Sequence, residues 1–307
     1  MRDCPPPYRP FRGADPPHFV DRPSEEDLGR SGIVGAALDI YQSGPRDLRF
    51  HRLVAGGPAI GKTALLRALC HQVEVRLGWA AIFHRCLAKE RAMGSLSSEV
   101  IASVSRHWKD ARPSRRALAG GGSSWADLKG VLEGCGRAAS LSGSGILVAL
   151  DDVDVLGAGE AESFGYLARR LAFEGLPVAL LLSGDLSLAE RFERSGYFSG
   201  TLWATELAPF DTGEAREAIV VPASERGVEF EERALEAASA AAGGSPLEIQ
   251  RIGFASWAAA NSRDRVTLAD VDAAVRFTTG RVSVGRVSMA SVAPRGRPVR
   301  ELAAMAR

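Results

Sequence analysis

Residues Gly56 to Thr63 read GGPAIGKT and match the phosphate-binding loop pattern G-x-x-x-x-G-K-[ST]. The preceding residues 50–55, FHRLVA, form an apolar run that predicts a strand. After the loop, Leu65, Leu66 and Leu69 recur at helical spacing. A strand, a glycine loop and a helix in this order are the context that the pattern requires, so we expect a site for the phosphates of a nucleoside triphosphate.

The chemistry of such a loop gives each of its residues a role. Backbone N–H groups and the positive end of the helix face the phosphates, and the glycines let the chain pass close to the ligand. Lys62 is expected to reach the β and γ phosphates, and the Thr63 hydroxyl to ligate a bridging Mg²⁺ ion. The expected nucleotide contacts are Gly56, Gly57, Pro58, Ala59, Ile60, Gly61, Lys62, Thr63 and Ala64.

A second segment supplies the carboxylates that a phosphate-binding loop needs. Residues 146–150 are five consecutive apolar residues, which suit a strand buried on both faces, and Asp151 and Asp152 follow at its carboxyl end. We assign Asp151 to the magnesium shell and Asp152 to polarising the attacking water, with Asp154 as a further acid nearby. Because Asp is one methylene shorter than Glu, the water must sit closer or hydrolysis will be slow.

Composition narrows the class of protein. The chain has 307 residues, 46% of them hydrophobic, which is enough for an α/β core and a second, smaller domain. The net charge of +1 argues against a protein that binds nucleic acid through a strong overall positive charge. The four cysteines show no C-x-x-C spacing, and no apolar run reaches the length of a membrane span. We therefore expect reduced thiols, a cytoplasmic location and no membrane partner.

Strands alternate with helices along most of the chain, which predicts an α/β fold with a parallel sheet and helices on both faces. Strands are expected at 50–55, 79–86, 146–150, 176–182 and 202–207, and helices near 24–42, 95–108, 125–138 and 160–173. Beyond Pro209 the pattern is helical only. The expected domains are a disordered proline-rich lead (1–17), a P-loop core (18–209), a small all-helical lid (210–278) and a basic tail (279–307).

With these segments in order, the chain resembles the AAA+ and STAND-like ATPases of bacteria over residues 18–278. The resemblance implies ATP as the nucleotide, in keeping with the lack of an N-K-x-D guanine motif. FVDRPSEEDL (19–28) is similar to the segment before the family's P-loop, which implies that Arg22 lies beside the base. LPVALLLSGDLSL (176–188) is similar to the sensor-1 strand, which implies that Ser183 senses the γ-phosphate.

Two features depart from the AAA+ pattern. Leu247 stands where a sensor-2 arginine is usual, and Gly244-Ser245-Pro246 is closer to the STAND G-x-P signature, which implies that Pro246 contacts the nucleotide. Arg251, one turn further on, is either a substitute sensor or an exposed helix arginine. The resemblance also implies that the segment after residue 278 is the start of a truncated winged helix, as an alternative to a solvated basic tail.

Arg169 and Arg170 occupy the neighbourhood where AAA+ rings place an arginine finger. Such a finger reaches the γ-phosphate of an adjacent subunit. The alternative is an ordinary pair of arginines on the polar face of a helix.

The leading hypothesis is an ATP-hydrolysing molecular switch, slow without its partner, whose lid movement a protein partner reads. One alternative is an Orc1/Cdc6-like DNA-associated ATPase that uses Arg112, Arg115, Arg116 and the C-terminal arginines on phosphates. Another is a nucleotide-holding protein with little turnover, suggested by Asp152 and the missing sensor-2 arginine. A small-molecule kinase is a weaker option, and assembly as a homo-oligomer stays open.

Overall fold

The computed structural model describes residues 5–10, 19–23, 32–86, 96, 99–100, 102–103, 106, 125–155, 158–195, 202–261 and 264–283. These residues form two compact units. The sheet unit contains the described residues within 23–58 and 65–207, and the helical unit contains those within 1–22, 59–64 and 208–307.

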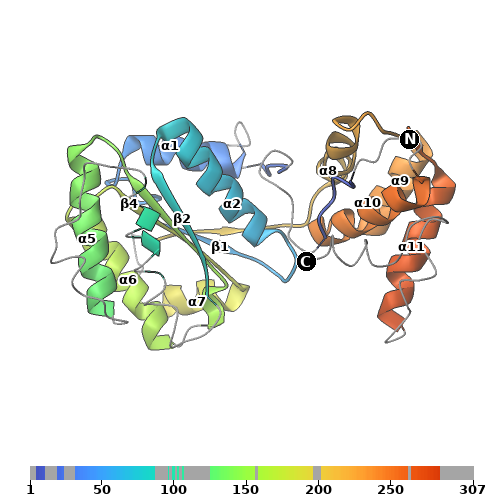
Figure 1. Cartoon of the computed structure of the whole chain (residues 1–307). Coiled ribbons are helices and arrows are strands. Elements are labelled where there is room, and N and C mark those ends of the chain that lie inside the picture. The colour runs from blue at the N-terminus through green and yellow to red at the C-terminus, as the bar shows by residue number, and fades with distance from the viewer. Residues whose placement is uncertain are drawn as a thin grey trace. The chain divides into compact units, whose positions relative to one another are not determined.

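The sheet unit is built on five parallel strands in the order β2-β3-β4-β1-β5 (Figure 1). Every residue of β3 and β4 is buried, which agrees with their continuous apolar sequences. The strands are β1 Arg52–Ala55, β2 Ala80–Arg85, β3 Ile146–Asp151, β4 Val178–Gly184 and β5 Trp203–Glu206.

Helices cover both faces of this sheet, as the alternating sequence pattern predicts (Figure 1). One face carries α5, α6 and α7, whose buried side chains share a core with alternate residues of β3 and β4. The other face carries α1 and α2. The helices are α1 Ile33–Ser43, α2 Lys62–Gln72 with its π-helical extension η3 Val73–Leu77, α5 Trp125–Leu141, the short η4 Val153–Val155, α6 Ala158–Phe173 and α7 Leu186–Ser195.

Two helices expected from the sequence are described only in part. Residues 24–31 lie outside the described residues, and α1 begins at Ile33. Most of the helix expected near 95–108 also lies outside them.

The helical unit contains four helices and a small pair of parallel strands, β6 and β7. Only helices were expected there, because a two-residue strand is too short to show an alternating pattern. The elements are α8 Thr212–Ser224, β6 Glu229–Phe230, α9 Glu232–Ala242, α10 Pro246–Ala260, β7 Arg265–Val266 and α11 Leu268–Ser283. Helix α8 begins with a capping box between Asp211 and Glu214.

Residues 5–10 differ from the disordered lead that the sequence predicts. Tyr8 is 2% exposed within the core of the helical unit, and its hydroxyl donates to the backbone carbonyl of Ile219 at 2.6 Å. A Cβ at Gly253 would come within 2.6 Å of the Tyr8 ring, so the glycine makes room for this ring. The composition of a proline-rich segment does not reveal that a single aromatic side chain anchors it.

His51, just before β1, is a buried titratable residue that contacts the neighbouring strand β4. It is 1% exposed, and its Nδ1 accepts a hydrogen bond from the backbone N–H of Leu180 in β4 at 3.1 Å. Burial lowers the pKa of His51 from 6.5 to about 4, because the charged imidazolium would lose its hydration. The folded protein therefore holds His51 neutral.

We expect this histidine to make folding sensitive to acid. Between pH 6.5 and about 4 the unfolded chain binds a proton at His51 that the folded chain does not, so stability is lost as the pH falls through this window. The full contribution is about 3 kcal/mol in the free energy of unfolding. Urea unfolding at about pH 7 and about pH 4.5 measures it. The His51→Asn variant keeps an acceptor for the Leu180 amide but does not titrate, so it should lose less stability between about pH 7 and about pH 4.5 than the wild type does. Equal losses in the two proteins would contradict the assignment.

Candidate functional site

The glycine loop connects β1 to α2 as the sequence predicts. Strand β1 ends at Ala55, and Lys62 is the first residue of α2, followed by Thr63 and Ala64. In the sheet unit, the Gly56 N–H donates to the carbonyl of Gly184 at the end of β4 at 3.2 Å. The loop therefore starts at the carboxyl ends of β1 and β4.

Backbone geometry explains the glycines of the loop in two different ways. Gly61 has a φ of +99°, and a Cβ there would lie 3.4 Å from Nη2 of Arg22 and 3.6 Å from Cγ of Pro246. At Gly57 a Cβ would meet no protein atom within 4 Å. The protein itself thus requires glycine at 61 but not at 57, where close approach of a ligand to the backbone gives a reason for it.

Arg22 lies against the backbone of the loop within the helical unit. Its Nη2 donates to the carbonyl of Ile60 at 2.6 Å, and its Cζ lies 4.4 Å from the centroid of the Phe210 ring. The residue is 5% exposed, and burial lowers the pKa of Arg22, while the charges of Glu214 and Asp21 oppose this shift. The resemblance implies a place beside the base; the contacts observed are to the loop and to Phe210.

Pro246 is brought to the same part of the loop by the start of α10. It is the first residue of that helix, and the Ser245 side chain caps the helix by accepting from the Glu248 N–H. Gly244 has a φ of +73°, and a Cβ there would lie 2.5 Å from the carbonyl oxygen of Phe210, so this turn requires glycine. The sequence Gly244-Ser245-Pro246 thus places a rigid residue against Gly61.

The acidic end of β3 forms a compact cluster in the sheet unit. Asp151 is fully buried, and its Oδ1 accepts a hydrogen bond from the Ser183 hydroxyl at 2.6 Å. The same Ser183 oxygen accepts from the backbone N–H of Asp152 at 3.2 Å. Ser183 therefore orients the Asp151 carboxylate, and its role as a γ-phosphate sensor stays a prediction.

Arg85 is a site residue that the sequence analysis missed. It ends β2, directly beside Asp151 in the register of β2 and β3, and its Nε and Nη2 each lie 2.8 Å from Oδ2 of Asp152. Asp152 has a φ of +58°, which Asp tolerates better than most residues, and this turns its side chain away from the strand. A basic residue at the carboxyl end of a neighbouring strand was the signal available in the sequence.

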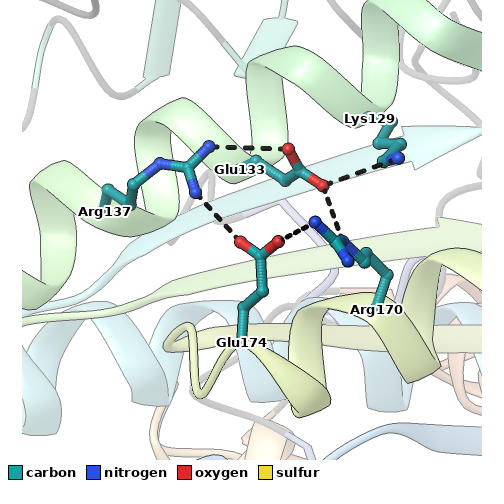
Figure 2. A network of polar contacts seen from close by, with 5 residues as sticks. All are labelled: Lys129, Glu133, Arg137, Arg170 and Glu174. Carbon is teal, nitrogen blue, oxygen red and sulfur yellow. Dashed lines mark hydrogen bonds and ion pairs between the residues drawn. The ribbon is translucent and has the colours of Figure 1, made fainter.

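Arg251 and Arg170 are both held by carboxylates. Arg251 in α10 donates to Glu248 at 2.6 Å, and its side chain is 48% exposed, which agrees with an exposed helix arginine. Arg170 near the end of α6 pairs with Glu133 and Glu174 (Figure 2). Because α6 runs from the carboxyl end of β3 back to the start of β4, Arg170 lies at the opposite edge of the sheet from Asp151.

The donors proposed for magnesium fit the chemistry of that ion. Mg²⁺ at nucleotide sites is usually held by one or two protein oxygens together with phosphates and water. The Thr63 hydroxyl and the Asp151 carboxylate are hard oxygen donors of this kind. Within the described residues, no group of three or more His, Cys, Asp or Glu side chains could hold a metal ion by itself.

No protein-family model matches this sequence, and no curated protein matches it either. Solved structures do match the fold. The ORC2 protein of Aeropyrum pernix, in ADPNP–ADP complexes, is 16% identical with a TM-score of 0.57, over 92% of this chain and 74% of that one. The ORC1 protein of A. pernix in complex with DNA is 18% identical with a TM-score of 0.56, over 86% and 67%. The RuvB branch migration motor of Thermotoga maritima is 16% identical with a TM-score of 0.52, over 86% and 73%. The chain thus shares the fold of these solved proteins.

Within the described residues, no helix combines the length and the hydrophobicity needed to cross a membrane.

We expect Arg22 to support phosphate binding by fixing the loop. Arg22→Gln removes a charged hydrogen bond to the Ile60 carbonyl, which is worth about 2 kcal/mol, so affinity should fall roughly 10- to 30-fold. Because the contact is to the loop, the loss should be similar for ATP and for inorganic tripolyphosphate, measured by calorimetric titration. Phe210→Leu, which removes only the ring beneath the guanidinium, should lose less. A loss confined to ATP would instead place Arg22 at the base.

Proposed function

We propose that this protein is an ATP-binding molecular switch of the AAA+/STAND type, which hydrolyses ATP slowly and whose helical unit is read by a protein partner. The observation that carries the proposal is the connection of β1 to α2 through a glycine loop that presents Lys62 and Thr63 as the first residues of a helix. A helix N-terminus in this context favours bound phosphate.

The proposed roles follow from the chemistry of each side chain. Lys62 binds the β and γ phosphates, and Thr63 with Asp151 holds Mg²⁺, which supplies charge neutralisation of the phosphates when bound. Asp151 is suited to a fixed role because it is buried and oriented by Ser183. Asp152 is more accessible, with 30% of its side chain exposed, and takes the role of orienting water.

The helical unit contains contacts that support a switch. Arg22 and Pro246 both lie against residues 60–61 of the loop, and both belong to the helical unit. A change in the loop on binding or losing a nucleotide therefore acts directly on a residue at the start of α10. We propose that the partner reads this response.

A nucleotide-holding protein with little turnover is the second candidate, and one observation favours it. The Asp152 carboxylate already forms an ion pair with Arg85, which occupies its Oδ2 and leaves less of the carboxylate free to hold a water molecule. An Orc1/Cdc6-like role on DNA stays an alternative: Arg112, Arg115 and Arg116 and the C-terminal arginines lie outside the described residues. The ORC1 protein of similar fold was solved with DNA.

We also propose a cytoplasmic location, from the state of the cysteines. Cys70, Cys86 and Cys135 are buried free thiols. Thiols of this kind are usual in a reducing compartment.

Lys62→Ala tests the nucleotide site. The phosphates lose the cationic side chain of the loop, so ATP affinity should fall by at least about 100-fold, measured by titration with a fluorescent ATP analogue. Lys129→Ala is the matched control; Lys129 belongs to α5, which covers the opposite face of the sheet from α2, and this variant should bind ATP as the wild type does. Unchanged affinity in Lys62→Ala would overturn the site.

Asp152 and Arg85 are tested together by steady-state turnover. Asp152→Asn should keep ATP affinity and lower turnover about 10- to 100-fold, because an amide is a poor base. Arg85→Ala should raise turnover by releasing the carboxylate, and should have no effect in the Asp152→Asn background. If Arg85→Ala changes turnover equally in both backgrounds, the residue does not act through Asp152.

A further inference from the structure

Helices α5 and α6 present two neighbouring stripes of side chains away from the sheet. On α5, Lys129, Glu133, Arg137 and Leu141 succeed one another at four-residue intervals, so each lies about one turn from the next along the helix. On α6, Tyr166, Arg170 and Phe173 succeed one another at spacings of four and three. We call the six of these residues other than Glu133 the α5–α6 surface.

Ion pairs hold the two stripes side by side (Figure 2). Arg137 contacts Glu133 at 3.5 Å and Glu174 at 2.9 Å, which links α5 to the end of α6. Arg170 contacts Glu133 at 3.4 Å and also pairs with Glu174. Lys129 lies 3.8 Å from Glu133, and its Nζ lies 5.7 Å from the centroid of the Tyr166 ring. The surface is therefore continuous across both helices.

The cations of this network face outward and the carboxylates lie beneath them. The side chains of Glu133 and Glu174 are 14% and 18% exposed, whereas those of Lys129, Arg137 and Arg170 are 37%, 58% and 41% exposed. Three cations over two carboxylates leave a positive outer layer. The carboxylates hold the guanidinium groups in place, which lowers the entropy cost of binding a further anion.

Exposed apolar side chains follow these cations at the ends of both helices. Leu141 is 91% exposed and Phe173 is 86% exposed, the two highest values for large hydrophobic side chains among the described residues, and Tyr166 is 55% exposed. Leu141 is the last residue of α5, about one turn after Arg137, and Phe173 is the last residue of α6, next to Glu174. Exposed apolar groups that gather among arginines are typical of protein-binding surfaces.

We propose that the α5–α6 surface docks an acidic, amphipathic segment of a partner protein. Charge complementarity selects acidic side chains, and Leu141 and Phe173 select an apolar face beside them. A nucleic acid fits less well, because Glu133 and Glu174 repel phosphates and the exposed leucine has no role in binding them. The inference rests on the proposed function only in that the switch has a protein partner, and the docking itself requires no ATP turnover.

The probe is a labelled helical peptide of about 16 residues with leucines on one face and glutamates on the other. Its affinity is measured by fluorescence anisotropy, and a peptide with every Glu replaced by Lys serves for comparison. We expect the acidic peptide to bind at least about 10-fold more tightly than the lysine peptide, and Leu141→Ser/Phe173→Ser to weaken it roughly 10-fold or more. Both residues are exposed, so the folded structure should tolerate these changes. Arg137→Gln should weaken the acidic peptide and reduce the salt dependence of its binding.

The matched control is Leu48→Ser/Val75→Ser, which removes two side chains that are each 67% exposed elsewhere. It should bind the peptide as the wild type does. Equal binding of the two peptides, or equal effects of the two double variants, would overturn the proposal. Displacement of the peptide by duplex DNA would also overturn it. So would a loss of self-association in Leu141→Ser/Phe173→Ser, measured by sedimentation, because the surface would then be an interface between copies of the chain. ATP binding is measured in every variant, so a failure of the nucleotide site is distinguished from a failure of docking.

Discussion

The parallel pairing of β1 with β4 is the interaction on which the proposed site depends. The two strands are in register from Arg52 and Leu181 to Ala55 and Gly184, and the Gly56 N–H extends the ladder by one more bond to the Gly184 carbonyl. On its other side, β4 pairs with β3, and this pairing places Ser183 of β4 within hydrogen-bond distance of the Asp151 carboxylate at the end of β3. The glycine loop and the acids, far apart in the sequence, thus start from one sheet edge because of backbone hydrogen bonds.

The two adjacent acids at that edge have different surroundings, and their proposed roles follow from this difference. Asp151 continues the buried strand and receives a hydroxyl hydrogen bond, so its carboxylate is fixed in orientation. Asp152 leaves the strand with a positive φ and meets Arg85, so its carboxylate is accessible but engaged. A fixed oxygen suits a metal shell, and an accessible one suits a base whose availability can change. Adjacent residues thus present one buried, oriented carboxylate and one accessible, ion-paired carboxylate.

Much of this arrangement could be predicted from the sequence, because it rests on local patterns. Buried parallel strands read as continuous apolar runs, and the glycine loop is marked by its own glycines and lysine, so the strands and the connection of β1 to α2 were predicted at the right residues. Arg85 could not be assigned, since its role depends on the register of β2 against β3 rather than on its neighbours in the chain. Tyr8 was missed for a similar reason: its partners Ile219 and Gly253 are more than two hundred residues away.

Tyr8 and Arg22, both near the beginning of the chain, make contacts within the helical unit. Tyr8 is anchored between α8 and α10, and the Arg9 N–H donates to the Gln250 side chain at 2.8 Å. Further along the same segment, Arg22 holds the carbonyl of Ile60 and stacks on Phe210 just before α8. The beginning of the chain therefore contacts both the helices and the loop within one unit. A shift of the loop backbone at Ile60 is opposed by a buried guanidinium that also stacks on Phe210, so a displacement of Ile60 must either move Arg22 or break this hydrogen bond.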